Sequence, residues 1–177
     1  MYKMITKNEL LSSNIIKVPS IVLTSNLYGF FAWRIRVHTK NAYSHAMILH
    51  KRDKFASQDK KFQSVPIEDY LSGKFRIKIW YSPKWSIKEC DNMLKKVNED
   101  LEKGGKYDWI GIIGYFLGLK YINSKNRNYC SEHVKSILHL TNEGLKWEIE
   151  NPSPGEIDKY FSSKPDIYKA LVYDPTI

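Results

Sequence analysis

Residues 128–134 have the sequence Asn-Tyr-Cys-Ser-Glu-His-Val, and this stretch contains the candidate nucleophile of the chain. A polar loop precedes this stretch. After it, Val134, Ile137 and Leu138 recur at spacings of three and four, which is typical of one face of a helix. The pattern predicts a helix to about residue 141, with Cys130 at or just before its first turn.

A thiol at that position is a candidate nucleophile. Unpaired N–H groups and the positive end of the helix dipole favour an anion there. Such a setting can lower a cysteine pKa from about 8.5 to roughly 3.5–7.5, so that thiolate is available at neutral pH. The alternative is that Cys130 is a small buried hydrophobic residue.

The composition indicates one globular domain. The chain has 177 residues, of which 42% are hydrophobic and 14% aromatic, so it is long enough to bury a core and is not of disordered type. Cys90 and Cys130 do not suggest a disulfide framework, and they favour a reducing compartment.

The formal net charge of +9 attracts nucleic acid or anionic lipid. Because the lysines are spread along the whole chain, we favour a solvated lysine-rich surface over a surface that binds nucleic acid. The first 20 residues contain no signal-peptide pattern, and the longest apolar run, 109–119, is shorter than the roughly 20 residues that span a bilayer. We therefore expect a protein that acts in the cytoplasm or is delivered by a partner.

Hydrophobic patterns predict a β-rich first half and a helical second half, which is an α+β arrangement. Residues 1–14 form a predicted N-terminal arm, and 15–177 form one domain. An aromatic and basic helix is expected within 26–39, with its apolar side packed inward. Strands are predicted at 21–24, 42–49, 54–58, 62–65, 75–81 (half-exposed) and 169–173, and further helices at 86–103, 109–119 and 156–161.

A nucleophilic thiol needs a base, which is most often histidine. His133 and His139 lie on the predicted helix of Cys130. Both are weak candidates for the base, because the side chain at 133 points back along the turn outside the site and His139 is more than two turns away. His45 lies within an otherwise apolar strand, where a polar ring needs a hydrogen bond. It is either a satisfied core histidine or the base.

A third group should orient the imidazole. Residues that lie directly opposite in a hairpin share one face. A turn centred between Lys51 and Arg52 places Gln58 opposite His45, whereas a turn centred on Lys51 places Ser57 there. A metal site formed by His45, His50 and Cys130 is disfavoured, because positions 45 and 50 face opposite sides of a regular strand. No metal and no cofactor are expected.

Several motifs together resemble a known family. They occur in the order Val18–Thr24, Tyr43–Ile48, Val65–Leu71, Tyr107-Asp108, Tyr129–Glu132 and Ser153-Pro154. This order is similar to that of the circularly permuted branch of the NlpC/P60 papain-like superfamily, the YiiX/YaeF-type group. The resemblance implies a papain-like fold in permuted order, with an antiparallel sheet packed against helices.

The resemblance also implies the chemistry. Cys130 becomes the nucleophile and His45 the base, and the third position, often Glu in this family, falls on Ser57 or Gln58. The expected activity is cleavage of an amide or ester bond through an acyl-thioester, with a peptide, peptidoglycan or lipid substrate and Tyr107 and Tyr129 as wall residues. The alternatives are a lipid acyltransferase of the lecithin-retinol type that docks on an anionic membrane, and a non-enzymatic nucleic-acid binder.

Overall fold

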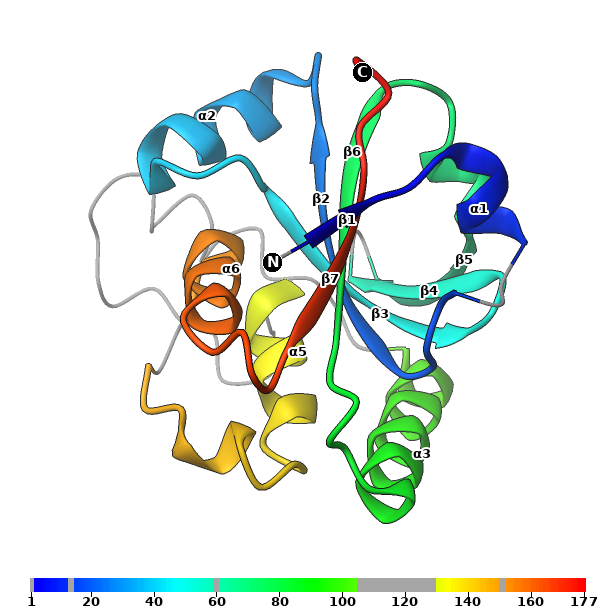
Figure 1. The fold of residues 1–177 in the computed structure, drawn as a ribbon, viewed down its shortest axis with the longest axis vertical. Coiled ribbons are helices and arrows are strands. Elements are labelled where there is room, and N and C mark those ends of the chain that lie inside the picture. The colour runs from blue at the N-terminus through cyan, green and yellow to red at the C-terminus, as the bar shows by residue number, and fades with distance from the viewer. Residues whose placement is uncertain (1, 13–14, 59–60, 105–129, 150–151) are drawn as a thin grey trace.

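A computed structural model describes residues 2–12, 15–58, 61–104, 130–149 and 152–177. They form an α+β fold around a seven-stranded mixed sheet of order β1-β7-β6-β2-β3-β4-β5 (Figure 1). Strand β1 pairs parallel with β7, and the other neighbours are antiparallel. The strands are β1 Tyr2–Met4, β2 Ser20–Asn26, β3 His45–Lys51, β4 Lys54–Gln58, β5 Phe62–Pro66, β6 Phe75–Tyr81 and β7 Lys169–Tyr173.

Helices lie on both sides of this sheet. They are α1 Lys7–Leu11, α2 Phe30–Thr39, α3 Ile87–Lys103, α5 Cys130–Leu138 and α6 Pro154–Ser162, with 3₁₀ turns η1 Ile67–Tyr70 and η2 Gly144–Lys146. The predicted strands and the helices that begin near 86, 130 and 156 are confirmed. The predicted helix at 109–119 lies outside the described residues. None of the described helices has the length and apolar character needed to cross a bilayer.

The sheet is buried on both faces. Side chains from α3, α5 and α6 pack against one face, and side chains from α1 and η1 pack against the other. The side chains on the face of α3, α5 and α6 form the first core, and those on the face of α1 and η1 form the second core. Within β2, Ile21 and Leu23 belong to the first core and Val22 belongs to the second. A strand covered on both sides has a continuous apolar run instead of an alternating one. For the same reason the prediction that β6 is half-exposed is wrong, because Lys78 and Trp80 are both buried.

The ends of α3 follow from local chemistry. The hydroxyl of Ser86 accepts the backbone N–H of Glu89, and the Glu89 carboxylate accepts the N–H of Ser86. Gly104, with φ of 59°, ends the helix in the left-handed conformation that glycine adopts readily. The sequence pattern had suggested that Ile87 shares a buried stripe with Met93 and Val97. This is wrong, because Ile87 lies about 120° around the helix from Met93 and is 82% exposed.

Helix α2 differs from the prediction that its apolar side packs inward. The side that meets the sheet carries Arg36, whose Nη1 donates to Ser25 Oγ at 2.6 Å and to the Asn26 carbonyl at 2.8 Å. Phe30 and Trp33 remain exposed as a result. In Figure 1 the helix lies at the periphery, beside the end of β2.

The first residues contribute to the sheet. Tyr2 to Met4 pair with Ala170 to Val172 of β7, and Thr6 and Glu9 cap α1 reciprocally. Leu10 of this helix is fully buried. The segment predicted as an arm therefore supplies an edge strand and part of the second core.

We expect Ile137→Ala to lower the free energy of unfolding by about 2–4 kcal/mol, because it leaves a cavity where α5 packs on the sheet. Ile137 is fully buried, whereas Ile87 is 82% exposed. Ile87→Ala is therefore the control and should change stability by less than about 0.5 kcal/mol. Urea unfolding measures both. Equal losses in the two variants would contradict the placement of α5.

Candidate active site

Cys130 is the first residue of α5, as the sequence predicts. Its side chain is buried, and both cysteines of the chain are free thiols. Val134, Ile137 and Leu138 of the same helix pack into the core that contains Ala46 and Ile48 of β3. The helix is held against the sheet by this apolar face, so its N-terminal end and the thiol are fixed in place.

His45 is the first residue of β3. Its Nε2 lies 3.0 Å from the Oγ of Ser57 on β4. Neither of the two expected hairpin registers occurs, since Ser57 is directly opposite Met47. The pairing shifts between Leu49 and Lys51, where the strands are irregular. Ser57 is therefore a diagonal neighbour of His45 on the same face, and a diagonal pair is still within side-chain reach.

Gln58, the other candidate for the third position, is directed to the opposite face of β4. It pairs with Phe62 of β5 and is buried. Phe62 belongs to the core that contains Cys130, and its ring contacts that of His133 at a centroid distance of 4.1 Å. Of the two residues, Ser57 is the one with the observed hydrogen bond to His45.

The strand end that carries His45 borders both cores. Alternation along β3 gives His45 the same face as Met47, which belongs to the second core. Its neighbours Tyr43 and Ala46 belong to the core of Cys130. Positions 43 and 45 would share a face on a regular strand, so the alternation is broken directly before His45.

His133, which the sequence ranks low as the base, lies on the buried face of the Cys130 helix. Its Nε2 is 3.7 Å from Asp100 Oδ2, and its side chain is only 7% exposed. Burial lowers its pKa to about 4, which Lys96 reinforces and Asp100 opposes. The imidazole is therefore neutral at pH 7. Its spacing of three residues from Cys130 was the available signal, since such residues are neighbours on a helix.

A second histidine lies among the strands. The Nε2 of His50 is 2.9 Å from the Oγ of Ser64, so this ring is fixed between β3 and β5. Burial, followed by the nearby charge of Lys51, lowers the pKa of His50. The sequence had offered this residue only as a metal ligand.

A buried cation was missed by sequence analysis. Lys78 Nζ lies 2.7 Å from Asp158 Oδ1 of α6, and the indole of Trp80 donates to the same oxygen at 2.9 Å. Nζ also lies 5.7 Å from the ring centre of Tyr43, and burial, with Asp158 adding to it, raises the pKa of that phenol. Lys78 alternates with apolar residues along β6, so its pattern resembled a solvent-facing position.

Tyr107 and Tyr129, the expected wall residues, lie outside the described residues. The candidate residues are Cys130 and the buried neutral His133 on α5, and the His45–Ser57 pair at the open end of the β3–β4 hairpin. Helix α5 packs on the face of the sheet that carries Ala46 and Ile48, whereas strand alternation gives His45 and Ser57 the face of Met47. A thiol in the first turn of a helix lies where the unpaired backbone N–H groups favour its anionic form.

Comparison with known proteins supports the fold. No family model matches the chain, and no curated protein matches it. Among solved structures, the chain is similar to the crystal structure of the metalloprotein yiiX from Escherichia coli O157:H7, described as DUF1105. The two share 14% sequence identity over 87% of each chain, with a TM-score of 0.52. The chain thus has a YiiX-like fold.

Because yiiX is described as a metalloprotein, the residues of this chain must be compared with the requirements of a metal site. Across the described ranges, no group of three or more His, Cys, Asp or Glu side chains is arranged to hold a metal ion. His45 and His50 are each paired with a serine hydroxyl instead. The described donors do not fit a metal, and the mechanism proposed for this chain uses none.

We expect the stability of the protein to fall as the pH drops from about 6.5 toward 4 because of His133. Its folded pKa of about 4 is below the unfolded value of about 6.5, so the unfolded chain binds the proton first. The stabilisation is complete above pH 6.5 and decreases below it, by on the order of 3 kcal/mol across the window.

Urea unfolding at several pH values in this range, with wild type and His133→Gln, measures the effect. The variant should show a flatter dependence, because a glutamine does not titrate. Parallel curves for the two proteins would contradict a buried neutral His133.

Asp158→Ala should lower the free energy of unfolding by about 3–5 kcal/mol, since it leaves Lys78 buried and unpaired. The pair of Lys146 and Glu143 provides the control, because its Lys146 side chain is 66% exposed. Lys146→Ala should cost about 0–1 kcal/mol. Thermal and urea unfolding report both. A small loss in Asp158→Ala would show that solvent reaches Lys78.

Proposed function

We propose that this protein is a cysteine hydrolase with a papain-like fold in circularly permuted order. The observation that carries the proposal is the position of Cys130, a free thiol at the N-terminus of a helix that packs on the strand beginning with His45. The YiiX-like fold supports it at the level of architecture. The reaction is cleavage of an amide or ester bond in a peptide, peptidoglycan or lipid.

His45 acts as the base in this proposal. Ser57 Oγ accepts the Nε2–H of the ring, which leaves Nδ1 to take the proton of the Cys130 thiol. The hydroxyl carries no charge, so it stabilises the imidazolium less than a carboxylate would. The serine therefore orients the ring, but it raises the basicity of His45 less than a carboxylate at the third position would.

The proposed reaction has two stages. The Cys130 sulfur attacks the substrate carbonyl, and the backbone N–H of Cys130 donates to the oxyanion, a contact worth about 3–4 kcal/mol in known enzymes. The C–N or C–O bond breaks, the leaving group takes the proton from His45, and an acyl-thioester remains. Water, deprotonated by His45, then releases the acid and restores the thiol. Tyr107 and Tyr129 are proposed to line the substrate site.

A lipid acyltransferase of the lecithin-retinol type is the second candidate. It uses the same acyl-thioester, which an alcohol or amine attacks in place of water. Its supporting observation is the exposed aromatic surface of α2 on a protein of net charge +9, because both features favour contact with an anionic lipid surface. Transfer of a radiolabelled acyl group to an added amine, in competition with hydrolysis, distinguishes the two activities.

The test of the hydrolase is the rate of iodoacetamide labelling of Cys130 below pH 7, followed by peptide mass spectrometry. Cys90 serves as the internal control, since burial raises its pKa and its neighbours Glu89 and Asp91 add to the shift. We expect Cys130 to react faster than Cys90. His45→Ala should slow Cys130 labelling by roughly tenfold or more, as the thiolate fraction falls.

His133→Ala is the matched control variant, because it removes the buried imidazole on the Cys130 helix itself. It should leave the labelling rate of Cys130 close to that of wild type. A variant pattern in which His133, and not His45, controls the rate would assign the base to His133. Equal and slow labelling of both cysteines would falsify the hydrolase.

A further inference from the structure

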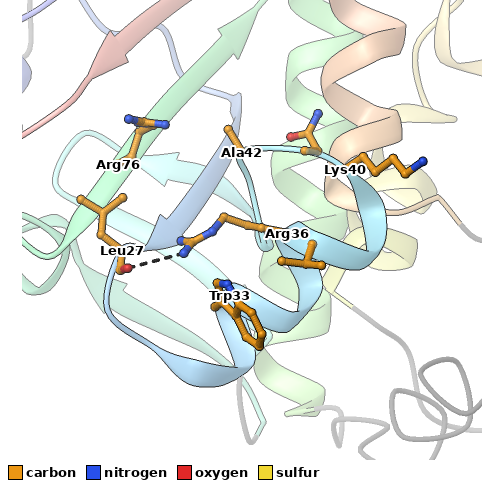
Figure 2. A pocket seen from close by; sticks show the side chains of 8 residues that line it. Leu27, Trp33, Arg36, Lys40, Ala42 and Arg76 are labelled. Carbon is orange, nitrogen blue, oxygen red and sulfur yellow. Dashed lines mark hydrogen bonds between the residues drawn. The ribbon is translucent and has the colours of Figure 1, made fainter.

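A basic hollow lies where α2 meets the ends of β2 and β6, and no part of the proposed hydrolase mechanism uses it. It has a volume of about 430 Å³. Three cations, Arg36, Lys40 and Arg76, line it together with Leu27, Trp33 and Val37 (Figure 2). The described lining contains no carboxylate. An anionic group is therefore the ligand that its charge favours.

Two of the three cations keep their charge uncompensated. Arg76 is neutralised, since its Nε donates to Asp174 Oδ2 at 2.6 Å. Arg36 is held by uncharged oxygens at the end of β2, including the Leu27 carbonyl at 3.4 Å, so its orientation is fixed while its charge remains (Figure 2). Lys40 is exposed at the rim, and its ammonium has no ion pair with the described residues.

The backbone at Lys40 allows a simple test of its side chain. Lys40 ends α2 with φ of 49° and ψ of 41°, the left-handed conformation. Glycine or asparagine is preferred at such a helix end, because a Cβ is strained there. Of the described residues other than glycine, Lys40 is the one with a positive φ. Lys40 therefore holds a backbone position that glycine would adopt without strain.

An apolar row extends from the hollow along α2. Phe30, Trp33 and Val37 follow one another at spacings of three and four, so they lie on one side of the helix. Their exposed fractions are 67%, 46% and 55%. The rings of Phe30 and Trp33 contact each other, with centroids 5.8 Å apart. Trp33 and Val37 also line the hollow, so the apolar row and the cations form one continuous surface.

We propose that α2 is a docking face for an anionic lipid membrane. Phe30, Trp33 and Val37 enter the boundary between headgroups and acyl chains, where an apolar helix face with an aromatic ring is favoured. A lipid headgroup phosphate lies against Arg36 in the hollow, while Lys40, whose side chain extends away from Arg36 at the rim (Figure 2), contacts a neighbouring headgroup. The net charge of +9 adds attraction to the whole surface.

The shape of the surface favours a membrane over a nucleic acid. Bases stack on separate aromatic platforms beside a groove of cations that follows the backbone. Here the two rings pack on each other, and the aliphatic Val37 continues the row along the outside of a helix. A convex apolar row with cations at one end fits the plane of a lipid surface.

The experiment is sedimentation of the full-length protein with vesicles of phosphatidylcholine, with and without phosphatidylserine. We expect binding to the vesicles that contain phosphatidylserine, and binding that weakens as salt is raised. Lys40→Gly should weaken it about fivefold, the equivalent of roughly 1 kcal/mol for one cation near the surface. The same variant should not lower the melting temperature, because glycine relieves the left-handed strain. Trp33→Ser should weaken binding without loss of the fold.

Helix α3 offers matched controls at the other side of the molecule. Ile87 is exposed and apolar, and Lys88 is exposed and basic. Ile87→Ser and Lys88→Gln should bind the vesicles as wild type does. In all four variants the labelling rate of Cys130 should be unchanged, so that this surface is tested separately from the thiol.

Three results would overturn the proposal. The first is equal binding to vesicles with and without phosphatidylserine, or equal losses in the α2 and α3 variants. The second is binding of inorganic phosphate in the hollow by a protein that does not sediment with vesicles. This result would indicate a free anion as the ligand. The third is binding of single-stranded RNA that the α2 variants lose while vesicle binding is absent, which would indicate a nucleic-acid surface.

Discussion

The packing of α5 on β3 is the contact on which the candidate site depends. Val134, Ile137 and Leu138 are buried against the strand that contains Ala46 and Ile48. Because this apolar contact fixes the axis of the helix, it also fixes the N-terminal end where Cys130 lies. A thiol at the end of a loosely held helix would have neither a fixed position nor a fixed electrostatic environment. The proposed role of the sulfur as a nucleophile therefore depends on this hydrophobic contact.

Burial of the sheet on both faces has a second consequence. Polar groups on the inner strands must be satisfied inside the protein or lose their charge. Lys78 is satisfied by Asp158 and by the surrounding rings, while His133 loses its charge. The His45–Ser57 and His50–Ser64 pairs solve the same problem with hydroxyl groups. Two histidines of β3 are thus held in place by serine hydroxyl groups, and the proposed base, the half-buried His45, is one of them.

The proposed chemistry and the proposed docking face belong to different parts of the fold. Cys130 is at the buried end of α5, whereas the row on α2 is exposed to solvent. The side of α2 that meets the sheet carries Arg36, whose guanidinium is held by oxygens of Ser25 and Asn26. Because that polar contact attaches the helix, its aromatic residues remain available for a partner. For this reason the docking proposal is placed on this aromatic and basic helix of a protein of charge +9.

The sequence by itself determined the features that depend on neighbouring residues. These are the capped start of α3 at Ser86, its end at Gly104, the β3–β4 hairpin and the position of Cys130 at the start of a helix. Capping, glycine and hydrophobic spacing act within a few residues, so a single sequence contains them. The sequence also offered two neighbouring candidates, Ser57 and Gln58, for the residue that orients the His45 ring. Ser57 forms a hydrogen bond with His45.

Only the tertiary structure decided the features that depend on what covers each surface. The irregular hairpin register brought Ser57 diagonally to His45, and the second layer of the fold buried Lys78 although its strand pattern resembled an exposed one. His133 became neutral because α3 and β5 enclose it, and Phe30 and Trp33 stayed outside because Arg36 was the side chain that met the sheet. Burial and long-range pairing are properties of the assembled chain, and no local pattern contains them.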